Sequence, residues 1–179
     1  MLKMTSISTA SKIGVHCLLA ADLLNFGNNE TTKDKVEEEK RFILNLGKHL
    51  FAKVPDCKAG IWVYGFVEGN PTPPLLNKET MIDSYNEFET STDEMMRLTA
   101  NISGIHNQRK NVDDFRNATL NSTKSKFQRI VAVGFNSLEL SKIVIPPNGK
   151  SVSLSSNYSE ELPSVLHAVL QDFTPNFSK

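Results

Sequence analysis

The chain is predicted to be an α/β protein, with a mostly parallel sheet between two layers of helices. Two observations predict this fold class. Short apolar runs that suit strands alternate along the sequence with longer segments of helical periodicity. The strongest runs are also continuously apolar, which is typical of parallel strands covered on both faces. A succession of strands and helices of this kind predicts a three-layer α/β/α domain.

Composition favours one soluble globular domain. The chain has 179 residues, of which 39% are hydrophobic and 22% charged. We expect the domain to span residues 12–173, with a flexible N-terminus at 1–11 and a C-terminal tail at 174–179. Twenty basic residues balance twenty acidic ones, so no nucleic-acid partner is expected. No run of eighteen apolar residues occurs, so no membrane insertion is expected either.

The first strand is predicted at 12–21, and a helix of about twenty residues follows it at 32–54. Thr32 can cap this helix, and the run EEEKR that begins at Glu37 is interpreted as its solvated face. One apolar stripe is expected to face the core, flanked by Phe42 and Phe51: Val36, Ile43, Leu46, Leu50 and Val54.

The second strand is predicted at 58–67, where β-branched and aromatic residues are frequent. A short edge strand is expected near 80–85. Ser91 and Glu94 have the spacing of a capping box and predict the start of the next helix.

The second half of the chain supplies two further strands. The third strong run is at 127–135, and an outer strand is expected at 150–156. Helices are expected at 112–122, 137–145 and 159–173. Pro163 is expected in the first turn of the last helix, where its missing N–H breaks no hydrogen bond.

Two cysteines, Cys17 and Cys57, fit no metal motif. They can form one disulfide, although Cys17 in mid-strand and Cys57 before a strand can be too far apart to bridge. Two buried or half-buried free thiols are the alternative.

Six Asn-x-Ser/Thr triplets suggest an extracellular, N-glycosylated protein. Chance would give about two or three in a chain this rich in Asn, Ser and Thr. The alternative is an Asn-rich intracellular chain. The candidate glycosylation sites are Asn29, Asn101, Asn117, Asn121, Asn157 and Asn176.

No catalytic or nucleotide-binding motif is evident. The sequence has no Gly-rich dinucleotide fingerprint, no P-loop and no nucleophile elbow. Asp22 follows the first apolar run, where α/β proteins bind ligands, and His106 falls in a predicted loop. These two residues could act as acid and base in a small intracellular, cytoplasmic enzyme. The other histidines are interpreted as structural.

The order of elements resembles a von Willebrand factor type A (VWA) domain, a Rossmann-like fold. The resemblance covers most of 12–173. In the first half it rests on the strand that ends at Asp22, on the long helix that follows, on the second strand, and on the helix STDEMMRLTANISGI. In the second half it rests on the closing part, from RIVAVGFNSLELSKIV to the final helix that opens with Glu-Leu-Pro. The composition is similar to that of secreted nematode-type members. The family has one more strand than this sequence supplies.

The resemblance implies a degenerate metal site. Family members hold Mg²⁺ with Asp-x-Ser-x-Ser after the first strand, a later Thr and a later Asp. Asp22 matches the first position, but Leu24 and Phe26 stand at the serine positions. The last Asp position falls near Phe135 or Asn136. Asp22 is therefore interpreted as a vestige, with no metal or other cofactor.

The resulting expectation is a non-enzymatic, extracellular or cell-surface adhesion module that binds a protein or glycan. Leu24, Phe26 and His106 are the candidate contact residues, because they fall in loops expected at one rim. Leu24 and Phe26 could instead cover the core as a lid. A purely architectural domain within a larger extracellular chain is a third reading.

Overall fold

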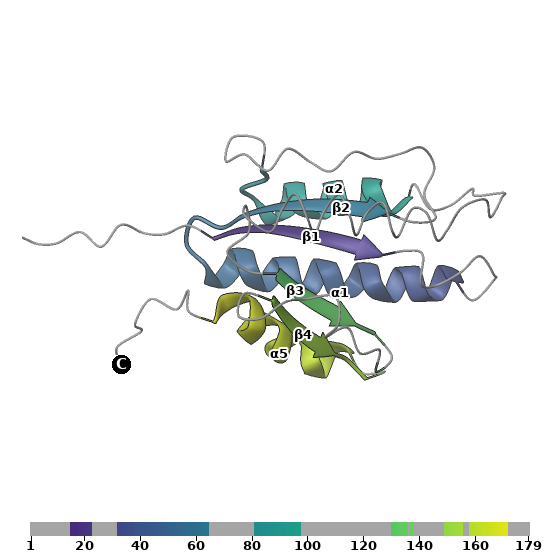
Figure 1. Ribbon diagram of the computed structural model, residues 1–179. Coiled ribbons are helices and arrows are strands. Elements are labelled where there is room, and N and C mark those ends of the chain that lie inside the picture. Colours follow the sequence, from purple (N-terminus) through teal and green to yellow (C-terminus); the bar gives the residue numbers. More distant parts are fainter. Residues whose placement is uncertain are drawn as a thin grey trace, which may run out of the picture.

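A computed structural model describes residues 15–22, 32–64, 81–97, 130–135, 137, 149–155 and 158–171. Strands and helices alternate along these residues, which confirms the α/β class (Figure 1). The elements are β1 (His16–Asp22), α1 (Thr32–Lys53), β2 (Lys58–Tyr64), α2 (Tyr85–Arg97), β3 (Ile130–Gly134), β4 (Gly149–Ser153) and α5 (Tyr158–Leu170). No helix among them is long and apolar enough to span a membrane.

Strands β1 and β2 pair in parallel, from His16 opposite Lys58 to Asp22 opposite Tyr64. Their alternate residues belong to the hydrophobic core, and Ala21, Ala59 and Val63 are fully or almost fully buried. These residues are small or β-branched, which lets a helix pack closely on the strands.

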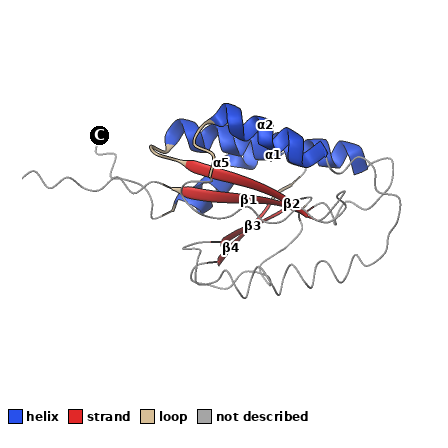
Figure 2. Ribbon diagram, turned by 90° about the horizontal axis from the view of Figure 1, so that it is seen from above, coloured by secondary structure: helices blue, strands red, loops and turns tan. Residues whose placement is uncertain are grey.

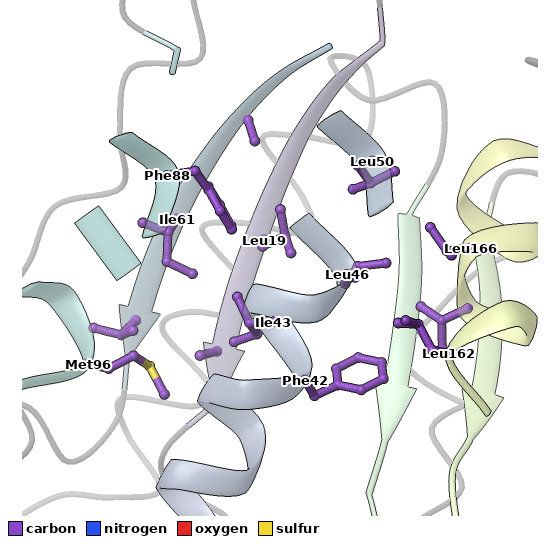
Figure 3. Close-up of a cluster of buried hydrophobic side chains, with 14 of the residues drawn as sticks. Leu19, Phe42, Ile43, Leu46, Leu50, Ile61, Phe88, Met96, Leu162 and Leu166 are labelled. Atoms are coloured by element: carbon purple, nitrogen blue, oxygen red, sulfur yellow. The ribbon is translucent and has the colours of Figure 1, made fainter. Parts of the chain in front are cut away.

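Helix α1 follows the predicted stripe. Val36, Ile43, Leu46 and Leu50 are buried at intervals of seven, three and four residues, and Val54 packs at the border of the core. Figure 3 shows Phe42, Ile43, Leu46 and Leu50 of α1 directed toward residues of the strands and of α5. The long helix was therefore predictable almost to its ends.

Helix α2 begins earlier than predicted, at Tyr85 rather than near Ser91. The cap is Ser84, whose Oγ accepts a hydrogen bond from the Glu87 N–H at 3.4 Å. Ser84 and Glu87 have the same capping-box spacing as the pair chosen from the sequence, so the motif was right and its position wrong. The expected edge strand is reduced to one antiparallel bridge between Ile82 and Ala59.

Strands β3 and β4 form a second parallel pair, with Ile130 opposite Gly149. The ladder continues past its ends, where Leu154 donates to the Gly134 carbonyl at 2.7 Å. Helix α5 follows and buries Leu162, Val165 and Leu166. Pro163 is the sixth residue of α5 rather than part of its first turn, because the helix begins at Tyr158. Its ring is exposed.

The three helices form one layer against the strands. Helix α1 contacts α2 on one side and α5 on the other, while α2 contacts β2 and α5 contacts β3 and β4. Figure 2 shows α1 and α2 together on one side of β1 and β2. The helices expected at 112–122 and 137–145 lie outside the described residues, so the second helical layer stays a prediction.

In the described part of the chain, β1 and β2 form one sheet and β3 and β4 form another, with no ladder joining β1 to β3. Both sheets contribute to one core, because Leu154 and the α5 residues belong to the same buried cluster as α1, β1 and β2.

Candidate functional site

The carboxyl ends of β1 and β2 meet at one edge, because the two strands are parallel and in register to their last residues. Asp22 ends β1 opposite Tyr64, which ends β2. The chain then returns from Asp22 into α1, whose N-terminus at Thr32 lies at the same end (Figure 1). We call this edge the carboxyl rim and define it by Asp22, Tyr64 and Thr32. In open α/β sheets this is the edge where ligands bind.

The structure places Asp22 at the rim but does not describe the residues predicted to act beside it. Leu24, Phe26 and His106 lie outside the described residues, as do the six candidate glycosylation asparagines. Within the described ranges, no group of three or more His, Cys, Asp or Glu could hold a metal ion.

The position that the resemblance assigns to the last metal-binding aspartate has a packing role. Phe135 follows directly after β3, and its ring makes edge contacts with Phe42 of α1 at 5.4 Å and with Tyr158 of α5 at 4.8 Å between ring centroids. Edge-to-face geometry of this kind stabilises the packing of aromatic rings. Asn136, the alternative register for this position, lies outside the described residues.

The backbone around Phe135 turns sharply. Ser137 has a φ of 60°, which is uncommon for a residue other than glycine. Its N–H donates to the Leu154 carbonyl at 2.6 Å. The N–H of Ser155 donates to the Glu161 carboxylate at 2.7 Å, which ties the segment after β4 to the first part of α5. These bonds hold the ends of β3 and β4 against α5.

Glu39 is the residue that the sequence analysis missed. It belongs to the run interpreted as solvated, yet it is only 5% exposed, whereas Glu37 and Glu38 are exposed as expected. The signal was its spacing: Glu39 lies three residues after Val36 and four before Ile43, which places it on the apolar stripe. It lies about 10 Å along α1 from Thr32, in the half of the helix that begins at the carboxyl rim. Glu39 is the one buried charged residue in the part of the chain that the structure describes.

Of the three described histidines, His49 alone has a contact that fits the structural role expected from the sequence. His49 is half-buried, and its ring Nδ1 lies 2.9 Å from the Asn45 carbonyl, to which it donates one turn back along α1. His16 and His167 are exposed, the first at the amino end of β1 and the second in α5.

Cys17 and Cys57 are free thiols, the alternative that the sequence left open. Burial raises the pKa of the Cys17 thiol to about 12, and the neighbouring Cys57 adds to the rise. Burial likewise raises the pKa of Cys57 to about 11. Both thiols are therefore protonated at neutral pH. They lie at the amino end of the sheet, away from the carboxyl rim.

Comparison with known proteins does not assign this chain to a family. No model of a known protein family matches this chain, and no curated protein matches it.

Proposed function

We propose that this chain is a recognition module of VWA type, with three layers, that binds a protein or glycan partner at the carboxyl rim without a resident metal ion and without catalysis. The observation that carries the proposal is the register of β1 and β2. It brings Asp22 and Tyr64 to one edge, so the segments that follow both strands leave from that edge.

The residue types near this edge support contact with a partner rather than with a cation. Mg²⁺ prefers oxygen ligands in a near-octahedral arrangement. The sequence offers Asp22 there, but Leu24 and Phe26 stand where the resemblance requires hydroxyl groups. In the second half of the sheet, Phe135 packs against Phe42 and Tyr158. Apolar residues in a loop are suited to a protein or glycan surface.

The first experiment is calorimetric titration of the protein with Mg²⁺, Mn²⁺ and Ca²⁺, together with an Asp22→Ala variant. We expect no heat of binding and the same melting temperature with and without each ion. Saturable binding that Asp22→Ala abolishes would refute the metal-free proposal.

Partner binding is tested separately, with a glycan array and a panel of extracellular matrix proteins in the presence of a chelator. We expect a bound partner to be lost in a Phe26→Asp variant and kept in Glu38→Ala, since Glu38 is exposed on α1. A partner that binds only when divalent ions are present would count against the proposal.

The proposal includes an extracellular or cell-surface location. The six glycosylation triplets support it. Expression in a eukaryotic secretory pathway, followed by mass spectrometry of the asparagines, tests it. Occupied triplets are expected, and a folded chain that leaves every triplet unmodified would contradict it.

A second candidate function is a small α/β enzyme that uses the carboxyl rim. Glu39 favours it, because an acid buried in the helix that begins at this rim could serve as a general acid or base. Thermal-shift screening with a metabolite library tests it. A small molecule that stabilises the native chain but not a folded Glu39→Gln variant would favour the enzyme over the adhesion module.

A further inference from the structure

The feature that leads beyond the proposed function is the placement of the two thiols. Cys17 lies in β1 opposite Ala59, and Cys57 comes two residues before Ala59. Lys58 donates its N–H to the Val15 carbonyl at 2.9 Å, which places Cys57 just before the first bonds of the β1–β2 ladder. The two cysteines are therefore diagonal neighbours across adjacent chain segments.

Both thiols lie on the same face of the sheet. Side chains alternate along a strand, so Cys57 shares the face of Ala59, which is the face of Cys17. Cys57 belongs to the buried core, and Cys17 packs against the same core while remaining partly accessible.

The two Cα atoms lie somewhat beyond the reach of a relaxed disulfide. Neighbouring strands are about 4.8 Å apart and each residue rises about 3.3 Å, so Cα atoms two residues out of register in a parallel pair are about 8 Å apart. A disulfide takes Cα separations of about 4.4–6.8 Å. A shift of about 1–2 Å would therefore close the gap. Cys57 lies outside the ladder, directly after Asp56, which turns the chain with a φ of 53°. The shift is assigned to this turn, because Lys58 and the residues after it are held by the β1–β2 ladder.

We propose that Cys17 and Cys57 are a reversible oxidation site that forms a cross-strand disulfide between β1 and the start of β2 when a small-molecule disulfide is the oxidant. The Cys17 thiolate attacks the oxidant and forms a mixed disulfide, and one thiol of the oxidant leaves. The Cys57 thiolate then displaces the second thiol. Two S–H bonds are lost and one S–S bond forms, while the two electrons reduce the oxidant to two thiols.

Exposure assigns different roles to the two cysteines. Cys17 is half-buried and is the more exposed residue of the two, whereas Cys57 is 5% exposed. Cys17 is therefore the attacking residue and Cys57 the resolving residue. The raised pKa values of both thiols make the reaction slow at neutral pH, so it is followed at mildly alkaline pH over hours.

The test incubates the folded protein with oxidised glutathione and follows its intact mass. We expect a loss of two hydrogen atoms, a linked peptide that contains Cys17 and Cys57, and recovery of both thiols with dithiothreitol. The fluorescence of Trp62, the single tryptophan, reports whether the protein stays folded during the reaction.

Two matched variants separate the roles. Cys57→Ser is expected to stop at a stable glutathione adduct on Cys17. Cys17→Ser is expected to acquire no adduct while it is folded. If the native protein accumulates the adduct without bridging, keeps both thiols, dimerises, or bridges only after native Trp62 fluorescence is lost, the proposal is wrong.

Discussion

The contact between α1 and α2 depends on Gly47, and Gly47→Ala is expected to destabilise the protein. In an exposed helix interior this substitution stabilises by about 1 kcal/mol, because glycine has the greater freedom in the unfolded chain. Here a Cβ on Gly47 would lie 2.8 Å from Cδ1 of Phe88 and closer still to Cε1. Phe88 is completely buried and also contacts Phe51, so its ring has little room to retreat.

The magnitude follows from these two opposing effects. Overpacking a core typically costs about 1–3 kcal/mol. After the gain in helix propensity of about 1 kcal/mol, the free energy of unfolding should fall by up to about 2 kcal/mol. For a chain of this size the melting temperature should then fall by up to roughly 8 °C. Urea unfolding followed by Trp62 fluorescence measures the change, with Lys48→Ala, an exposed neighbour, as the control.

A double-mutant cycle checks the cause. In a Phe88→Leu background the ring is gone, so Gly47→Ala should become neutral or stabilising by up to about 1 kcal/mol. If Gly47→Ala stabilises the protein even when Phe88 is present, the close packing of α1 on α2 is refuted.

Three further predictions follow from single residues. Glu39→Ala should lower the free energy of unfolding by about 2 kcal/mol because its side chain is buried, whereas Glu38→Ala should change it by less than about 0.5 kcal/mol in the same urea titration. Ser84→Ala should lower the free energy of unfolding by about 0.5–1 kcal/mol through loss of the cap, measured by thermal unfolding. A larger loss in Ser91→Ala would instead support the start of α2 that the sequence predicted. Because the pKa of Cys57 is raised to about 11 in the folded protein, stability is retained below the unfolded value near 9 and lost as pH rises from there toward 11. Cys57→Ala should therefore lose less stability than the parent chain between those pH values. Equal losses in both proteins would contradict the raised pKa of Cys57.

The sequence predicted the elements that repeat one physical pattern over many residues. Helix α1 was predictable because its apolar stripe extends over about five turns, and β2 because nearly all of its residues are apolar. The start of α2 was harder, since two Ser-x-x-Glu spacings lie seven residues apart and local chemistry does not distinguish them. Tertiary packing decides: Phe88, in the first turn of α2, is buried against Gly47, and this contact requires the helix to begin before it.

Residues of the candidate site were less predictable for a related reason. Glu39 was assigned to the solvent because three acids and two basic residues stand together, and charge runs are usually solvated. Helical spacing placed it on the apolar stripe. When composition and periodicity disagree within a helix, periodicity is the better guide, because it determines which direction the side chain points.

Helix α1 also explains how the two strand pairs are held in one core. In the described residues no ladder links β1 to β3, yet Phe42 of α1 contacts Phe135 beyond β3, while Ile43, from the same turn, lies in the core with Leu19 of β1. The same helix begins at the carboxyl rim and carries the buried Glu39. Its position therefore fixes the relation between Asp22 at the end of β1 and Phe135 at the end of β3. A change in α1 packing should therefore alter the position of Asp22 relative to Phe135, even when neither residue is changed.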